Sequence, residues 1–172
     1  MMQTFIALLR AVNVGGTGKL PMADLRDMAK TAGLTDVRSY IQSGNLVFTS
    51  PEKAPEVQAL LEAPLTRYAG KPQTVLIRSA ADMQSVLDQN PFPNAEPAKV
   101  GVLFLPAPSN ANGASQIKGQ SDEEIATGAR EIFIHFPSGM GRSKLRLPEM
   151  STGTMRNLNT VRKLVEMATE TS

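Results

Sequence analysis

The 172-residue chain contains no cysteine, no tryptophan and a single histidine, and aromatic residues make up only 5% of it. The absence of cysteine excludes disulfide bonds, a thiol nucleophile and cysteine-ligated zinc or iron–sulfur centres. One histidine cannot form a multi-histidine metal site, and the sequence has no close pair of carboxylates of the kind that metal hydrolysis uses. We therefore expect no metal and no cofactor. His135 alone could act as a general base, although a half-buried structural histidine is more typical of a strand.

Long hydrophobic runs are also missing. No segment approaches the ~20 consecutive apolar residues that span a membrane, and no basic region precedes the apolar residues Met2 to Leu9 as it would in a signal peptide. These absences predict a cytoplasmic protein without a membrane partner. The chain is 41% hydrophobic, with 12 prolines and 13 glycines, which indicates a globular protein with many turns. Its length predicts one ordinary domain or two very small ones that share a core.

The first half of the chain alternates between strand-like and helix-like hydrophobic patterns. The order strand–helix–strand–strand–helix–strand predicts a ferredoxin-like α+β subdomain over residues 1–79. A Ser-Gly-Asn turn between the second and third strands is typical of a hairpin, and Pro64 is expected to kink or divide the second helix. The predicted strands are Gln3–Arg10, Val37–Gln42, Leu46–Thr49 and Gln73–Arg78, and the predicted helices run from Met22 to Ala32 and from Val57 to Tyr68.

Residues 80–172 are predicted to form a second, mixed α+β subdomain that ends in a helix. A long loop or weak helix is expected over residues 106–120 because the segment is rich in proline, glycine, serine and asparagine. Ser121 and Glu124 have the spacing of a capping box, which predicts a short helix ending near Gly128. The predicted elements around it are a helix over Ala81–Gln89, strands over Val100–Leu105 and Glu131–Phe136, and a final helix with an apolar stripe at Leu158, Val161, Leu164, Val165 and Ala168.

Two turns in the first half could contact a ligand. Gly15 and Gly16 precede Lys19, but Leu20 and Pro21 break the phosphate-loop and dinucleotide patterns. The turn still offers backbone N–H groups before a helix, which can receive an anion, or it is simply a tight connection. The turn from Ser43 to Asn45 offers a hydroxyl and an amide, although hairpin geometry alone accounts for its glycine and asparagine.

The C-terminal segment from Gly139 onward has three more basic than acidic residues, although the whole chain is only +2. If residues 142–146 are helical, Arg142 and Arg146 lie one turn apart and repel each other. If Thr154 caps the final helix, Arg156 lies in its first turn, where the helix dipole disfavours a cation. A negative group between these side chains would resolve both conflicts. It is either a ligand phosphate or a carboxylate of the same chain, and the sequence favours neither.

Several motifs together resemble one bacterial family. They are R-A-V-N-V-G-G (10–16), Y-I-Q-S-G-N-L-V-F (40–48), N-P-F (90–92), G-R-S-K-L (141–145) and T-M-R-N-L-N-T-V-R-K-L (154–164). In these motifs and their order the chain resembles the family called domain of unknown function 1697. The resemblance implies two α+β subdomains, the first ferredoxin-like, and no defined activity. Ala11 and Leu158 depart from the family's usual glycine and tryptophan. Its recurring polar positions fall on Arg10, Asn13, Ser43, Asn45, Arg142, Ser143, Lys144, Arg156, Asn157 and Asn159.

The leading hypothesis is a site for a small phosphorylated or otherwise anionic ligand in a cleft between the subdomains. Arg142, Lys144 and Arg156 would bind the charge, while asparagines orient the ligand by hydrogen bonds. No nucleophile–base pair can be named from the sequence, so catalysis stays open. The candidate ligand-binding residues are Arg10, Asn13, Gly15, Gly16, Lys19, Ser43, Asn45, Arg142, Ser143, Lys144, Arg156, Asn157 and Asn159.

Two alternatives remain open. The chain could bind nucleic acid through its sheet or its basic C-terminal segment, although few aromatic side chains are present to stack on bases. Alternatively, no ligand exists, and the arginines form internal ion pairs that fix the two subdomains or a dimer interface. The sequence does not indicate the oligomeric state.

Overall fold

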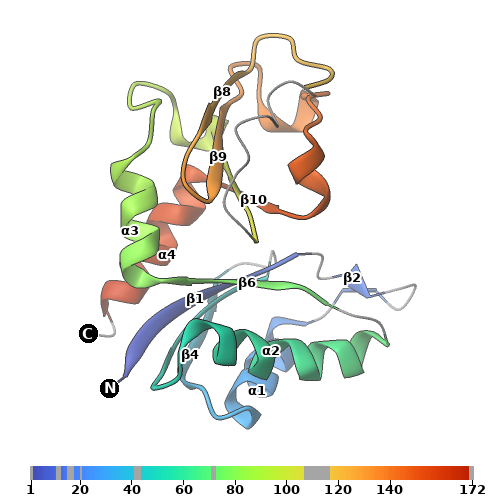
Figure 1. The fold of residues 1–172 in the computed structure, drawn as a ribbon, viewed down its shortest axis with the longest axis vertical. Helices are drawn as coiled ribbons and strands as arrows, with labels where there is room; N and C mark the ends of the chain where they lie inside the picture. Colours follow the sequence, from blue (N-terminus) through green and yellow to red (C-terminus); the bar gives the residue numbers. More distant parts are fainter. Residues whose placement is uncertain are drawn as a thin grey trace. The chain divides into compact units, whose positions relative to one another are not determined.

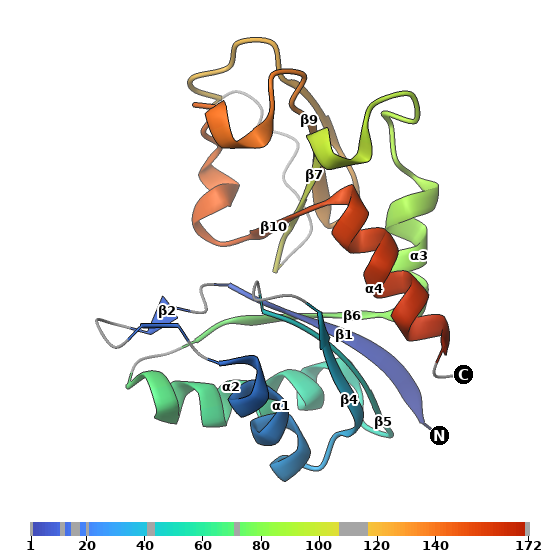
Figure 2. The same cartoon turned by 180° about the vertical axis from the view of Figure 1, so that it is seen from behind.

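The computed structural model describes residues 2–10, 13–14, 18–19, 21–40, 44–70, 73–106 and 117–170. Its contacts divide the chain into two units, Met1–Gln84 together with Leu164–Ser172, and Ser85–Lys163. The described residues form an α+β protein with four helices and two four-stranded antiparallel sheets (Figures 1 and 2). None of the helices described is long and apolar enough to cross a membrane. The predicted division into independent subdomains at residues 79 and 80 stays a prediction.

The first unit has the predicted ferredoxin-like order. Its sheet has the strand order β4-β5-β1-β6, and every neighbouring pair is antiparallel. Both α1 and α2 cover the same face of this sheet (Figure 1). The elements are β1 (Gln3–Leu9), α1 (Met22–Thr31), β4 (Thr35–Tyr40), β5 (Asn45–Ser50), α2 (Ala54–Ala69) and β6 (Val75–Ser79), with a short added hairpin of β2 (Asn13–Val14) and β3 (Gly18–Lys19).

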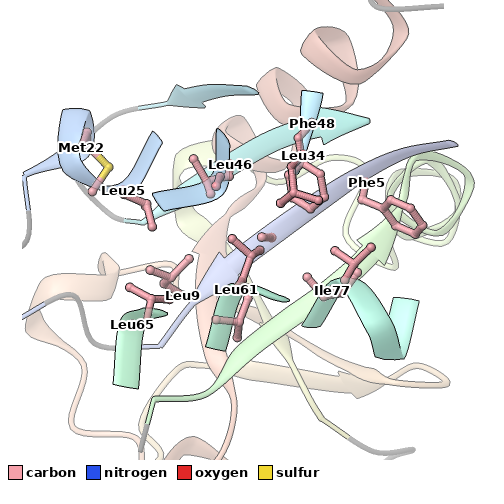
Figure 3. Packing of buried hydrophobic residues seen from close by; sticks show 14 residues of the cluster. Phe5, Leu9, Met22, Leu25, Leu34, Leu46, Phe48, Leu61, Leu65 and Ile77 are labelled. Carbon is pink, nitrogen blue, oxygen red and sulfur yellow. The ribbon is translucent and has the colours of Figure 1, made fainter. Parts of the chain in front are cut away.

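The hydrophobic core of this unit lies between the sheet and its two helices (Figure 3). Alternate residues of a strand point to one face, so Phe5 of β1 and Phe48 of β5 both point at the helices, with ring centroids 6.1 Å apart. Leu25 of α1 and Leu61 of α2 are fully buried against them. Each such side chain contributes about 1.5–3 kcal/mol through burial, which makes this layer the main source of stability in the unit.

Pro64 does not divide α2, so the second of the two predicted outcomes, a kink or a division, is wrong. The helix runs without a break from Ala54 to Ala69 and ends, as expected, at Gly70, which has φ +73°. A proline inside a helix removes one hydrogen bond. Leu61 and Leu65, on either side of Pro64, are both buried in the core, and their burial offsets that loss. Packing therefore outweighs the local preference of the proline.

The second unit is built on a sheet with the strand order β10-β7-β9-β8. One face of this sheet buries Leu103, Ile132 and Ile134 against Leu145 and Leu147, which come from the segment that precedes β10. Residues 107–116, most of the predicted long loop, lie outside the described residues. The elements from residue 80 onward are α3 (Ala80–Asp88), β7 (Val100–Phe104), β8 (Glu124–Thr127), β9 (Glu131–His135), β10 (Thr154–Asn157) and α4 (Leu158–Glu170), together with short 3-10 turns at Pro97–Lys99, Met140–Arg142 and Pro148–Ser151.

The short helix predicted from Ser121 to Gly128 is wrong, because the chain forms strand β8 there. Each residue from Glu124 to Thr127 is paired with a residue of β9. The backbone N–H of Ser121 donates to the carboxylate of Glu123, not as part of a capping box. A segment this short cannot nucleate a stable helix by itself. Pairing with the neighbouring strand therefore decides its conformation.

The predicted start of the final helix is also wrong. Thr154 begins β10, which pairs with β7, and α4 starts only at Leu158. Asn157 caps the helix, since its side-chain Oδ1 accepts a hydrogen bond from the Thr160 N–H over 2.9 Å. Arg156 therefore lies in a strand, and its predicted conflict with the helix dipole does not arise. The apolar stripe of α4 is buried as predicted, and in the first unit Arg38 donates to the carbonyl of Met167 over 2.8 Å.

Residues 142–146 do not form the helix on which the predicted repulsion between two arginines depended. A 3-10 turn ends at Arg142, and the backbone at Ser143 is extended. Arg146 pairs with Lys118 in an isolated antiparallel bridge. Arg142 and Arg146 are therefore not stacked one helical turn apart.

The cap at Asn157 generates a test of this fold. We expect Asn157→Ala to lower the free energy of unfolding by about 1 kcal/mol, since the Thr160 N–H loses its acceptor. Asn159→Ala is the matched control, because this exposed side chain lies just inside the same helix, and it should change stability by less than about 0.5 kcal/mol. Urea unfolding of the two variants measures the difference, and equal losses would contradict the assignment of the cap.

Candidate functional site

A polar pocket lies within the second unit, between residues 119–123 and residues 138–144. It has a volume of about 250 Å³. The two segments are held beside each other by backbone hydrogen bonds, from the Lys118 N–H to the Arg146 carbonyl over 3.0 Å and from the Arg146 N–H to the Lys118 carbonyl over 2.7 Å. Three residues predicted from the sequence, Arg142, Ser143 and Lys144, line this pocket together.

Gly119 allows the close approach of the two segments. Its φ is +71°, and a Cβ atom at this position would lie 2.1 Å from the carbonyl oxygen of Lys144. Only glycine satisfies both conditions. The sequence held no signal for this role, because glycine is common in loops of every kind.

Glu123 is the buried acidic group of the pocket, with 6% of its surface exposed. Its Oε2 accepts the hydroxyl of Ser143 over 2.5 Å, and its Oε1 accepts the Ser121 N–H over 2.6 Å. The Ser143 hydroxyl, followed by the Ser121 N–H, lowers the pKa of Glu123 below its ordinary value of 4.5. The carboxylate is therefore ionised throughout the neutral range.

Ser143 connects the pocket to the core of the unit. Its Oγ accepts the Leu145 N–H over 3.1 Å while its hydroxyl proton goes to Glu123. Leu145 is 1% exposed and belongs to the hydrophobic cluster beneath. On the other side of the pocket, the Ser138 hydroxyl donates to Asp122 over 2.5 Å. Each pocket carboxylate thus has a serine as its donor.

The two cations of the pocket have no acidic partner among the described residues. Arg142 and Lys144 are exposed, and within the residues that the structure describes neither side chain forms an ion pair or a hydrogen bond. Serine hydroxyls and an N–H satisfy Asp122 and Glu123 instead. The donors of an arginine and a lysine therefore remain for an anion from outside the chain.

Arg156 does not lie in this pocket. Met155 packs on the face of the sheet that carries Leu145, so the alternation of β10 directs Arg156 to the opposite face. Arg156 is 7% exposed and donates to Thr154 Oγ1 over 2.7 Å and to the Met155 carbonyl over 3.0 Å. Burial lowers the pKa of Arg156 to about 10, so its guanidinium stays protonated at neutral pH.

The other residues of the second unit that the sequence singled out do not line the pocket. Asn157 caps α4, and Asn159 is exposed on the same helix. His135 contacts a carboxylate, with its Nδ1 3.1 Å from Glu124 Oε1, and its ring centroid lies 5.6 Å from that of Phe92.

The remaining predicted residues belong to the first unit or fall outside the described residues. Asn45 is fully buried, and its amide donates to the Tyr40 carbonyl over 3.1 Å at the end of the hairpin. Arg10 is half-buried. Asn13 pairs with Lys19 in the small β2–β3 hairpin. Gly15, Gly16 and Ser43 lie outside the described residues.

No group of three or more metal-ligating side chains is present in the described ranges. Sequence reasoning missed several residues that build the pocket. Glu123 falls inside the predicted short helix, and Ser138 lies outside every predicted element. Neither has a distinguishing local pattern, because each acquires its role from a partner in the facing segment, 20 residues away for Glu123 and 16 for Ser138. The missed residues are Gly119, Ser121, Asp122, Glu123, Ser138 and Gly139.

The fold is that of an α+β protein with a ferredoxin-like first unit, and the comparisons assign its family. The family model described as "Protein of unknown function (DUF1697)" matches residues 2–133, and the chain belongs to this family. The conserved bacterial protein SP0830 from Streptococcus pneumoniae has a similar structure, with a TM-score of 0.81 and 27% sequence identity. The match covers 98% of this chain and 99% of that protein. A search of curated proteins found no match.

The Ser143–Glu123 contact generates a prediction about pH. Ser143→Ala should raise the pKa of Glu123 toward 4.5, because it removes the strongest interaction that lowers it. A lowered folded-state pKa stabilises the protein above the unfolded value, and this contribution is lost as the pH falls through the folded value. The variant should therefore lose less stability than the parent chain as the pH falls from neutral to below 4.5.

NMR titration of the Glu123 side-chain carboxyl measures the pKa directly, and urea unfolding at each pH measures the stability. Ser138→Ala is the matched control, because it removes the hydroxyl that donates to Asp122 in the same pocket. It should leave the Glu123 titration unchanged. An unaltered pKa of Glu123 in Ser143→Ala would contradict the assigned cause.

Proposed function

We propose that this protein binds a small phosphorylated ligand, whose anionic group is held by Arg142 and Lys144 at the pocket of the second unit. The observation that carries the proposal is the pairing inside the pocket. Both carboxylates accept hydrogen bonds from serines, while neither cation has an acidic partner among the described residues. Arginine offers planar paired donors that match phosphate oxygens, and lysine adds a second positive charge.

The carboxylates also restrict the rest of the ligand. A purely anionic molecule would be repelled by Asp122 and Glu123, so its phosphate must lie on the side of Arg142 and Lys144. Groups that donate hydrogen bonds suit the opposite side, since ionised carboxylates only accept them. A phosphate ester that carries hydroxyl groups, such as a sugar phosphate, combines both properties and is the proposed class of ligand.

Binding is better supported than catalysis. Ser143 and Glu123 make a hydroxyl–carboxylate contact of the kind that can activate a nucleophile. The lowered pKa of Glu123 makes it a weak base, however, and the oxygen of Ser143 already accepts the Leu145 N–H. We therefore assign the pair to shaping the pocket.

The two other functional classes have less support. Stacking of RNA bases would need aromatic side chains on the open face of a sheet, whereas Phe5 and Phe48 on the central strands of the first unit pack against its helices. The contacts of Arg156 with Thr154 and with the Met155 carbonyl suit a structural role. A structural role does not account for the exposed pair Arg142 and Lys144.

The proposal predicts selective stabilisation by phosphate esters. In a thermal-shift experiment, glucose 6-phosphate should raise the Tm, inorganic phosphate should raise it less, and glucose should not raise it. Arg142→Gln combined with Lys144→Gln should weaken the binding of glucose 6-phosphate by about tenfold or more. Arg162→Gln is the control, because it removes an exposed cation of α4 that does not line the pocket.

Raising the salt concentration should weaken binding in the parent chain, because the two cations are exposed to solvent. If a panel of sugar phosphates and nucleotides produces no shift, or if Arg162→Gln has the same effect as the double variant, the proposed function is wrong.

A further inference from the structure

A second concave site lies in the first unit, in the groove between α1 and α2. It has a volume of about 550 Å³, within the range of pockets that hold small molecules. The two helices lie next to each other on one face of the sheet (Figures 1 and 2). Most of the lining is apolar and is contributed by Met28, Ala32, Ala59, Leu60, Ala63 and Pro64.

The charged side chains of the groove gather toward one end. The helix α1 follows β1 and α2 follows β5, and these two strands are antiparallel, so the two helices also run in opposite directions. The first turn of α1 therefore lies beside the last turn of α2. Asp24 lies in that first turn and Arg67 in that last turn, with Asp27 one turn farther along α1.

These charged side chains form no ion pair with the described residues of the unit. Asp24, Asp27 and Arg67 are exposed, and among the residues that the structure describes none of them takes part in an ion pair. Each end charge has the sign that its helix dipole favours, so Asp24 and Arg67 are stable without a partner. The groove thus presents Asp24 and Arg67 at one end and Asp27 one turn farther along, and the rest of its lining is apolar apart from Thr31.

We propose that this groove binds a small zwitterion with an apolar tail, in the manner of an aliphatic α-amino acid. The ammonium group contacts Asp24 and Asp27, the carboxylate contacts Arg67, and the tail lies against Leu60 and Pro64. This assignment uses only first-unit residues and is independent of Arg142 and Lys144.

Charge complementarity selects this class of occupant over its relatives. An apolar carboxylate without an amine would meet Arg67 but would also face two carboxylates of the groove. An apolar amine would satisfy Asp24 and Asp27 and leave the arginine unused. A zwitterion without a tail would leave the apolar length of the groove in water. Only a molecule with all three parts matches the whole lining.

Four compounds, added to the complete chain, test what the ammonium group, the carboxylate and the apolar tail of the ligand each contribute to binding. L-leucine has all three, isopentylamine lacks the carboxylate, 4-methylpentanoate lacks the ammonium group, and glycine lacks the tail. In ¹H–¹⁵N NMR titrations, leucine should shift the amide signals of α1 and α2 until they saturate. The other three compounds should bind more weakly than leucine by a factor of about ten or more. Weak affinity is expected even for leucine, because the charged contacts are exposed to solvent.

Two variants test the assigned contacts. Arg67→Gln should reduce leucine binding to or below the level of isopentylamine, because the leucine carboxylate then faces Asp24 and Asp27 without a cation. It should not weaken isopentylamine binding. Lys30→Gln, an exposed cation of α1 that does not line the groove, should leave both unchanged. Ala63→Met should fill the groove and abolish the response to leucine, and far-UV circular dichroism confirms that each variant is folded.

Three results would overturn the assignment. They are no shift with leucine, equal binding of leucine and isopentylamine by the parent chain, and leucine binding that survives Arg67→Gln. Isopentylamine binding as tight as leucine binding would identify the groove as a site for apolar cations instead. A failure here would leave the response to glucose 6-phosphate, and with it the proposed function, intact.

Discussion

The hydrogen bond from Ser143 to Glu123 determines how the pocket of the second unit is organised. It joins the segment before β8 to the segment before β10, and it satisfies a buried carboxylate that has no cationic partner in the described part of the chain. A buried charge without donors would be strongly unfavourable, so Glu123 needs both Ser143 and the Ser121 N–H. Because these donors are sufficient, Arg142 and Lys144 are not drawn into the protein. Their exposure to solvent is the basis of the proposed function.

Two arginines of the C-terminal segment, Arg156 and Arg142, have opposite environments. Arg156 is buried in β10 and is held by Thr154 and by the carbonyl of Met155, so its charge serves the fold. Arg142 is exposed on the pocket and has no such contacts among the described residues. In the groove between α1 and α2, Asp24 and Arg67 are exposed in the same way as Arg142. In both units, then, exposed charges that form no ion pair with any described residue lie beside a concave surface. The proposed ligands would give those charges a role.

The first unit was largely predictable, because its strands and helices follow clear hydrophobic periods and its turns use glycine. Leu25 and Leu61 stand at helical spacing in the sequence, and Phe5 lies in an apolar run of strand length. The predictions failed where pairing with a strand distant in the sequence decides the conformation of a segment. Strands β8 and β10 are too short for their sequences to show a hydrophobic period. Pairing with β9 fixes the conformation of β8, and pairing with β7 fixes that of β10. The two pocket cations could be found from charge alone, but Glu123 and Ser138 could not, since their partners lie far along the chain.

The central claim is that Arg142 and Lys144 receive an anion at a pocket whose carboxylates are already satisfied. The most direct measurement follows the side-chain Nε–H signal of Arg142 and the Nζ signal of Lys144 by NMR while glucose 6-phosphate is added to the complete chain. The account predicts that both signals shift together and saturate, while the carboxyl signal of Glu123 keeps its low pKa. Side-chain signals that stay unchanged while the phosphate binds elsewhere, or does not bind at all, would contradict it.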